Sequence, residues 1–379
     1  MALGMWRTCV CRWCCIFSRL SRCKKTSKPF CSNIGCATIH NQHSRKMLPQ
    51  SAIDQWRTHG YALVHDFLPS NVTRAAVHAM RQHLPRDQGA TMTPDFGNDN
   101  ALAFPCNDAA LDAVPLHPQL LHAARTLLCT SYVRLHQAVA WGKYGLPAAT
   151  RTASRNDDQR LHQDFGNHMF GVPHDWDKPE AVAAIVYYSD VSETGGATAV
   201  LPRVLDATID PMYADPSLRL RNVGLCGVPF RNNRPDAEAL LHKIDPHAYT
   251  TRAAAYTRER HLTGARVGSV LFYRLDVWHR GTPVHEGQMR YTHNLVWTRP
   301  DAVGLNVWNG GLLQKMYQGW LEQWLAHATP PQLMALGFPP PWAHVWTSVA
   351  YRRAVALRYD GLDVDAYVLT GLELAWSRL

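Results

Sequence analysis

Residues 160–168 read RLHQDFGNH, and two side chains in this stretch decide how the chain is interpreted. His162 and Asp164 form the only His-x-Asp or His-x-Glu spacing among its twenty histidines. Alternate residues of a β-strand face the same side, so these two side chains can converge on one point while Gln163 points away. The apolar run AVAAIVYYSDV (181–191) follows and predicts a buried strand. We therefore predict a strand at 159–165 that presents two ligands for a metal ion.

Around this stretch the hydrophobic pattern is mainly that of strands, with helices on the N-terminal side. GYALVHDF (60–67) predicts a strand, and PSNVTRAAVHAMRQHL predicts a helix with Ser70 or Asn71 as its N-cap. HPQLLHAARTLLC (117–129) predicts a second helix with Pro118 in its first turn. The pattern is that of an α+β, mainly β domain with flanking helices, whose further strands we expect at 131–141, 181–189, 197–202, 267–274 and 289–298.

Composition excludes several classes of protein. Apolar residues make up 46% of the 379 residues, yet no apolar run approaches the roughly 20 residues of a membrane span. Nine of the 39 Lys and Arg residues fall in residues 1–50, which contain no acid, so the remaining 30 basic groups balance the 30 acidic ones. A neutral body gives no support for nucleic-acid binding. The expected partner is a small-molecule substrate, and the sequence does not reveal an oligomeric state.

The two ends of the chain carry different signals. Residues 1–46 are basic, acid-free and contain seven of the ten cysteines, which predicts a disordered or cleaved leader of mitochondrial type. Two alternatives stay open there: a zinc or redox site at the C-x-x-C of Cys11 and Cys14, and translation from Met47. The chain closes on Ser377-Arg378-Leu379, a variant of the Ser-Lys-Leu peroxisomal signal. Sequence alone does not decide between the two organelles.

The stretch VGSVLFYRLDVWHRGTPVHEGQMRYTHNLVW (267–297) can complete an iron site. Two histidines and one carboxylate hold Fe(II) on one face and leave three coordination positions for a bidentate oxo-acid and O2. His279 follows the predicted strand 267–274 and can supply the second imidazole. Arg290, eleven residues on, can grip a terminal carboxylate with its planar guanidinium, and Thr282 can add a hydroxyl.

These motifs resemble a known family in their order and approximate spacing. RLHQD, SETGGATAVLPR and HRGTP followed by an arginine resemble the phytanoyl-CoA dioxygenase family of Fe(II)/2-oxoglutarate oxygenases, over about residues 52–300. The resemblance implies a double-stranded β-helix (jelly-roll, cupin-like) core. It also implies Fe(II) bound by His162, Asp164 and His279, 2-oxoglutarate as co-substrate held by Arg290, and O2 as oxidant. Gln137, with Trp141 and Lys143 on its strand, is a candidate pocket residue, although ordinary strand packing explains the three slightly better.

The chain departs from that family in three places. Pro202-Arg203-Val204 stands where members commonly have Pro-Gly-Ser-His. Residues 205–266 read as a long loop or insertion of the kind that forms lids, and residues 301–379 as a helical C-terminal extension with an aromatic stripe from Leu313 to Leu325. Because substrate specificity resides in such regions, a CoA thioester is not assumed as the substrate.

Several alternatives remain open. His168, His174, His285 and His293 are spare metal ligands, and His285 competes with His279. The resemblance implies hydroxylation, since related halogenases lack the carboxylate and Asp164 closes the halide position. We expect a small or lipid-like organic substrate and release of succinate and CO2. The rivals are an inactive binding protein that keeps the fold, a nucleic-acid demethylase, and a cupin-like isomerase, which would not need Arg290.

Overall fold

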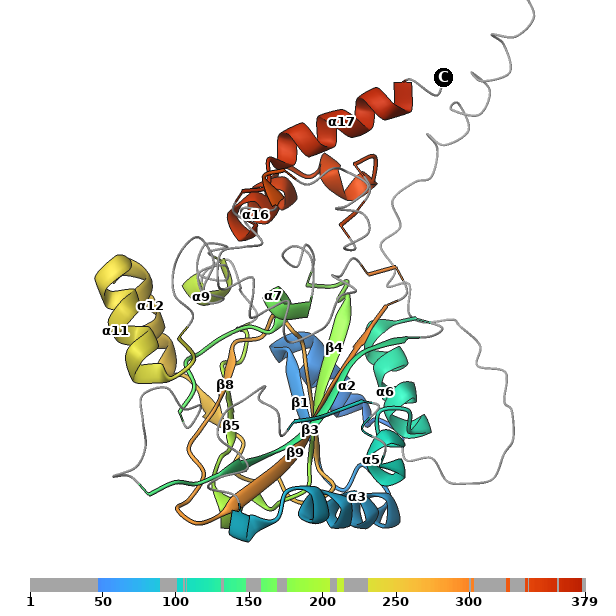
Figure 1. Ribbon diagram of the computed structural model, residues 1–379, viewed down its shortest axis with the longest axis vertical. Coiled ribbons are helices and arrows are strands. Elements are labelled where there is room, and N and C mark those ends of the chain that lie inside the picture. The colour runs from blue at the N-terminus through green and yellow to red at the C-terminus, as the bar shows by residue number, and fades with distance from the viewer. Residues whose placement is uncertain are drawn as a thin grey trace, which may run out of the picture. The chain divides into compact units, whose positions relative to one another are not determined.

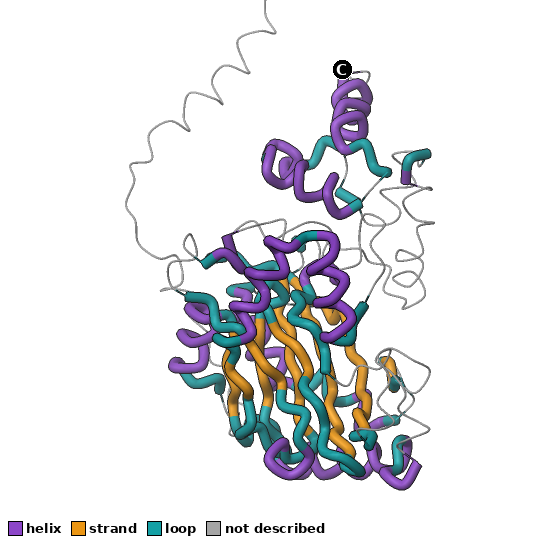
Figure 2. The backbone as a smooth tube through the Cα atoms, turned by 90° about the vertical axis from the view of Figure 1, so that its left-hand side faces the viewer, coloured by secondary structure: helices purple, strands orange, loops and turns teal. Residues whose placement is uncertain are grey.

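In the part of the chain that the structure describes, nine strands form two antiparallel sheets (Figures 1 and 2). The larger sheet has the order β1-β7-β4-β9-β3-β2 and the smaller one the order β6-β5-β8. The bounds of the strands are β1 Tyr61–Val64, β2 Leu102–Ala103, β3 Arg134–Tyr144, β4 Ala181–Tyr187, β5 Thr198–Val200, β6 Arg260–His261, β7 Val270–Tyr273, β8 His279–Gly281 and β9 Met289–Thr298.

The computed structural model describes only part of the chain. The chain divides into residues 1–44 and 45–379, and every described residue belongs to the second unit. The predicted leader, its C-x-x-C and the C-terminal tripeptide lie outside the described residues. These are 47–88, 101–104, 106, 108–130, 133–147, 158–168, 176–204, 210–214, 231–299, 301–302, 325–327, 338–339, 341–359 and 361–376.

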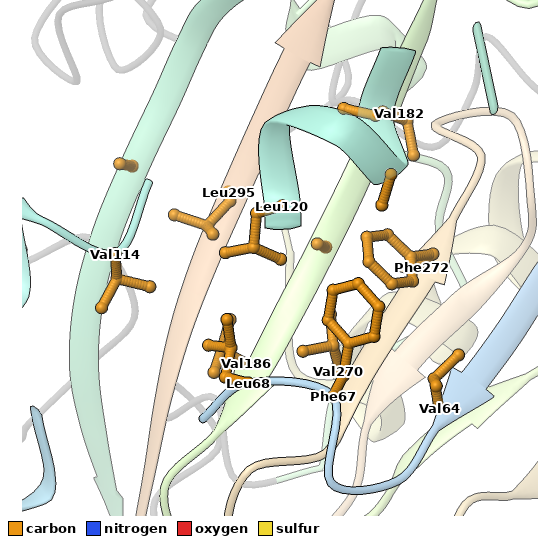
Figure 3. Close-up of a cluster of buried hydrophobic side chains, with 14 of the residues drawn as sticks. Val64, Phe67, Leu68, Val114, Leu120, Val182, Val186, Val270, Phe272 and Leu295 are labelled. Atoms are coloured by element: carbon orange, nitrogen blue, oxygen red, sulfur yellow. The ribbon is translucent and has the colours of Figure 1, made fainter. Parts of the chain in front are cut away.

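Strand β4 shows why the larger sheet has two different faces. All seven of its residues are buried, and successive side chains belong to two separate hydrophobic clusters. Val182, Ala184 and Val186 pack on one face with Phe272 and the helices (Figure 3), whereas the alternate residues point between the sheets. We call these the outer and the inner face. Residues of β9 alternate in the same way, which places Arg290 inside and His293 outside.

Helices from the N-terminal part of the chain cover the outer face. These are α2 Gln50–His59, α3 Ser70–His83, α5 Ala109–Asp112 and α6 Pro118–Leu128, with the short η1 Arg86–Gln88 after α3. Their apolar residues join the outer cluster, in which Phe67 meets Phe272 edge to face with ring centroids 5.4 Å apart. This is the predicted fold class, a double-stranded β-helix core with flanking helices. None of the described helices is long and apolar enough to cross a membrane.

The N-terminal helix predictions are confirmed except for one cap. Pro118 is the first residue of α6, where a missing N–H costs nothing. The N-cap of α3 is Pro69, and no side chain caps the helix. Ser70 and Asn71 were therefore wrong as N-caps, because both lie inside the first turn.

Two sequence predictions for the middle of the chain were also wrong. The stretch 159–165 is not a strand: it pairs through isolated bridges at Gln159 and His162 and then enters the short α7 Phe165–His168. Residues 205–266 are not simply an irregular loop, since the described part of this segment contains three helices and β6. These helices are α9 Pro211–Ala214, α11 Arg234–Ile244 and α12 Pro246–Tyr256.

The remaining helices are short or C-terminal. Helix α8, Val191–Thr194, precedes the Gly195-Gly196 turn. The C-terminal region contains η4 His344–Thr347, α16 Val349–Arg358 and α17 Val364–Trp376, which share a hydrophobic cluster of their own. Most of the predicted aromatic stripe at 313–325 lies outside the described residues.

Candidate metal centre

Backbone pairing brings the predicted metal ligands together. His162 and His279 exchange two N–H···O=C hydrogen bonds of 2.9 Å each, so two segments more than a hundred residues apart lie side by side. Asp164 lies in the bend after this bridge. Its carboxylate is 3.6 Å from Nε2 of His162 and 3.2 Å from Nε2 of His279. Among the described residues, this is the only group of three or more His, Cys, Asp and Glu residues whose ligand atoms all lie within 4.8 Å of one another.

Both imidazoles are held in the orientation that a metal requires. Nδ1 of His162 lies 2.9 Å from the carbonyl oxygen of Arg160, and Nδ1 of His279 lies 3.0 Å from that of Val277. A carbonyl only accepts hydrogen bonds, so each Nδ1 carries the proton and donates it. In the neutral ring the other nitrogen, Nε2, then offers its lone pair toward Asp164. Metal-bound histidines commonly use this arrangement.

The electrostatics of the three groups favour one carboxylate and at least one neutral imidazole. Burial lowers the pKa of His162 to about 3, and the neighbouring His279 acts in the same direction. Burial alone would raise the pKa of Asp164, but the two imidazoles, His279 foremost, hold it below its ordinary value. Burial opposes charge on His279 too, yet the Asp164 carboxylate raises its pKa. A metal ion at this centre would displace that proton.

Tyr273 contacts two of the three ligands, and the sequence analysis did not single it out. Its hydroxyl donates to Oδ2 of Asp164 over 2.8 Å, and its ring centroid lies 4.7 Å from that of His279. Burial raises its pKa well above the ordinary value, so the phenol is protonated and acts as a donor. In the sequence it reads as an apolar strand residue, and only the period-two placement on the inner face of β7 could have indicated this role.

Arg290 is a buried cation on the inner face of β9. It is 8% exposed, and it pairs with no carboxylate among the described residues. One Nη1 donates to the carbonyl oxygen of Gly196, whereas Nε has no hydrogen-bond partner. Burial lowers the pKa of Arg290, and nearby Tyr187 offsets this only in part. A buried guanidinium with an unpaired donor is a site for an anionic ligand.

The other predicted pocket residues lie at different distances from Arg290 along the sheets. The hydroxyl of Thr282 donates to the carbonyl oxygen of Ala197 over 2.7 Å, so its proton is already used. Lys143 stands in register with Arg290 and donates to the carbonyl oxygen of Thr282 over 2.8 Å. Gln137 is in register with Val296 of the inner face, so it points between the sheets, as Trp141 does opposite Thr292.

The spare histidines do not join the metal group. His293 lies on the outer face, 3.3 Å from the hydroxyl of Tyr188. His285 is exposed, and its Nδ1 donates to the carbonyl oxygen of Glu193. His168 is buried at the end of α7 with its ring centroid 5.3 Å from that of His136. His174 lies outside the described residues.

Helices α11 and α12 hold the backbone next to His162. The hydroxyl of Tyr256 accepts the N–H of Leu161 over 3.0 Å, and Arg252 donates to the carbonyl oxygen of Leu161 over 3.1 Å. Glu238 of α11 accepts from both side chains, at 2.6 Å from Arg252 and 2.9 Å from Tyr256. A region expected to form a lid therefore supports the metal-binding segment.

Comparisons with known proteins find a likeness to solved structures only. No family model matches the chain, and no curated protein matches its sequence. The chain is similar to the non-heme alpha ketoglutarate dependent carbocyclase SnoK from nogalamycin biosynthesis, with 16% identity, 73% of this chain and 94% of that chain covered, and a TM-score of 0.47.

Two further solved structures show a similar degree of likeness. HygX from Streptomyces hygroscopicus, with nickel and 2-oxoglutarate bound, is 16% identical over 67% of this chain and 88% of its own, with a TM-score of 0.41. EctD from S. alaskensis, with 2-oxoglutarate and 5-hydroxyectoine, is 15% identical over 70% and 80%, also with a TM-score of 0.41. At such identities no activity is carried over to this chain.

Proposed function

We propose that this chain is an Fe(II)- and 2-oxoglutarate-dependent dioxygenase that hydroxylates a small or lipid-like organic substrate and releases succinate and CO2. The observation that carries the proposal is the combination of two sites: a His-Asp-His group with both Nε2 atoms turned toward one carboxylate, and a buried arginine without a carboxylate partner. We also propose kinship with the phytanoyl-CoA dioxygenase family, on the motifs of residues 160–164, 192–203 and 279–290.

The residues present fit an iron ion and its co-substrate. His162, Asp164 and His279 would hold Fe(II) by two imidazole nitrogens and one carboxylate oxygen, the donor set of non-heme iron oxygenases. With 2-oxoglutarate and O2, such a centre supplies the oxidant that inserts oxygen into a C–H bond. Arg290 would neutralise the far carboxylate of 2-oxoglutarate, since its Nε is buried and unpaired.

Each residue has a task that its own contacts support. The backbone carbonyls of Arg160 and Val277 fix the imidazole tautomers. Asp164 occupies a coordination position that a halide would need, which favours hydroxylation over halogenation. The inner face of β3 and β9, where Trp141 lies opposite Thr292 and Gln137 opposite Val296, would form the wall against which co-substrate and substrate lie. Because the charge of residues 51–379 is balanced, a nucleic acid is not the expected substrate.

The experiment is uncoupled turnover of the co-substrate. The full chain is loaded anaerobically with Fe(II), and succinate formed from 2-oxoglutarate in air is measured without a prime substrate. We expect slow succinate formation that is abolished in H162A and reduced at least about 100-fold in R290A, because loss of a charge-assisted bidentate contact weakens binding severely. The control is H285A, since His285 lies outside the metal group. Absence of both succinate and the absorption band of the Fe(II)·2-oxoglutarate complex would favour the alternative, a binding protein that keeps the fold.

A further inference from the structure

We infer that Tyr273 is a positioning residue that restricts Asp164 to one-oxygen coordination of the metal. The inference deepens the proposed function, because it assumes that Asp164 binds a metal ion, and it concerns how many coordination positions stay open for the co-substrate.

The two oxygens of Asp164 are not equivalent. Oδ2 accepts the hydroxyl of Tyr273 over 2.8 Å and lies 3.2 Å from Nε2 of His279, whereas Oδ1 accepts no hydrogen bond from a described residue and lies 3.6 Å from Nε2 of His162. The side chain of Asp164 is 18% exposed, so water competes little for Oδ2. An oxygen that accepts a buried phenol is the weaker metal ligand of the pair, because part of its charge is already neutralised.

Tyr273 can fix the orientation of the Asp164 carboxylate because its own backbone is held by more strand pairing than that of Asp164. Its strand β7 is paired on both sides, with Tyr273 opposite Tyr61 of β1 and Ala183 of β4. Asp164 belongs to no strand and follows the single bridge at His162. The sheet therefore fixes the phenol, and the phenol fixes the carboxylate. The ring of Tyr273 packs against His279 as well, so it orients two of the three ligands.

Binding of Asp164 through one oxygen decides how many coordination positions of the metal stay open. Two imidazoles and a one-oxygen carboxylate leave three of six positions, enough for a bidentate 2-oxo-acid and O2. A carboxylate that bound through both oxygens would take one of these three. Tyr273 would thus protect the position that 2-oxoglutarate or O2 needs, without touching either.

The test compares Y273F with Y188F. Both substitutions remove one buried hydroxyl with a hydrogen bond, but Tyr188 is bonded to His293 on the outer face of the sheet. Binding of Co(II), and then of 2-oxoglutarate to the anaerobic Fe(II) protein, is titrated for wild type and both variants, together with the wavelength of the Fe(II)·2-oxoglutarate band.

We expect Y273F to keep Co(II) affinity within about threefold while its dissociation constant for 2-oxoglutarate rises about tenfold, the size of one lost hydrogen bond to a charged group. Its band should move to longer wavelength, because an unshielded carboxylate donates more charge to the metal. Y188F should match wild type. If Y273F folds poorly, 3-fluorotyrosine at position 273 keeps the ring and hydroxyl but donates more strongly, and should move the band to shorter wavelength.

The outcomes separate the two proposals. If wild type binds Co(II) and 2-oxoglutarate but Y273F has the same 2-oxoglutarate affinity and band, or fluorotyrosine leaves the band in place, the positioning role is wrong and the proposed function stands. If wild type itself shows no band that depends on His162, the proposed function fails, and the inference fails with it.

Discussion

Gly196 couples a tight turn to the candidate co-substrate residue. Its φ is +70°, a backbone conformation that L side chains rarely adopt, and its carbonyl oxygen accepts a hydrogen bond from Nη1 of Arg290. A Cβ atom there would lie 2.7 Å from Cγ2 of Val284 and 3.1 Å from Cδ of Arg290. The turn therefore needs glycine for two independent reasons, strain and space.

The substitution G196A should weaken 2-oxoglutarate binding by displacing Arg290, and should cost about 2 to 3 kcal/mol of stability through strain and crowding. The matched control is G287A: Gly287 has φ +69°, but a Cβ there meets nothing within 4 Å. Titration with 2-oxoglutarate measures the affinity of both variants, and denaturant unfolding measures their stability. Equal 2-oxoglutarate affinities for G196A and G287A would show that Gly196 does not shape the Arg290 site.

At the scale of single residues, the sequence predicts a role well where the role depends on neighbours along the chain. It predicts a role badly where the role depends on contacts made by packing. The His162–Asp164 spacing alone is weak evidence for a metal site, because such a histidine can simply hydrogen-bond the aspartate; joined to His279 and Arg290 in the right order, it predicts one. Tyr273 was missed because a tyrosine in a strand is indistinguishable from core until its neighbours are known. For the same reason, the donated proton of Thr282 could not be predicted.

At the scale of elements, prediction worked best where both faces of a strand are buried. Strand β4 follows from its apolar run and β9 from the alternation of MRYTHNLVWT, and β9 has the predicted bounds. The strand predicted at 159–165 was wrong. The spacing of His162 and Asp164 suggested a strand, but a single bridge at His162 is enough to bring this stretch next to His279. Helix α12 was missed although Asp245 before Pro246 is a start signal, and Asp245 does cap Ala248.

Helix α12 offers an element-scale prediction, because it holds the backbone beside a metal ligand. Y256F leaves the N–H of Leu161 without its acceptor. We expect Co(II) affinity to fall by roughly 10-fold, as for other partners that orient metal ligands, with a stability loss of about 1 to 2 kcal/mol.

Tyr249 provides the control on the same helix. Its ring packs against His242 with centroids 4.7 Å apart, and its hydroxyl makes no hydrogen bond with a described residue. Y249F should therefore leave Co(II) affinity unchanged. If both variants bind Co(II) like wild type, α11 and α12 do not support the metal centre.

At the scale of the whole molecule, the larger sheet separates packing from chemistry. Its outer face carries the main hydrophobic cluster with the N-terminal helices (Figures 1 and 3). Its inner face carries Arg290 and Tyr273, and Tyr273 contacts Asp164 and His279. Tyr273 of β7 and Tyr188, which follows β4, are both buried, yet they can be tested independently because they belong to the clusters of opposite faces. A titratable group that is buried away from the metal group affects the folding equilibrium and not the metal site.

Glu180 should make the stability of the folded chain depend on pH. Burial, with Asp301 next in size, raises the pKa of this carboxyl from 4.5 to about 7, although Arg299 opposes the rise. The folded state then binds the proton more tightly than the unfolded state does, so the free energy of unfolding falls as pH rises from 4.5 to about 7. Below pH 4.5 the carboxyl is protonated in both states, and above pH 7 it is ionised in both, so the loss is complete.

The substitution E180Q removes this titration while keeping the shape of the side chain. Relative to wild type, it should be more stable by about 3 to 4 kcal/mol at pH 8.5, at about 1.4 kcal/mol per pKa unit for a rise from 4.5 to about 7, with the difference shrinking steadily toward pH 4.5. Denaturant unfolding from pH 4.5 to 8.5 measures it, with E286Q as control because Glu286 is exposed. A difference between E180Q and wild type that stays constant over this range would mean that the Glu180 carboxyl has the same proton affinity in the folded and unfolded states. A difference that grows with pH would instead identify Glu180 as a buried carboxyl whose ionisation the fold tolerates at a cost in stability.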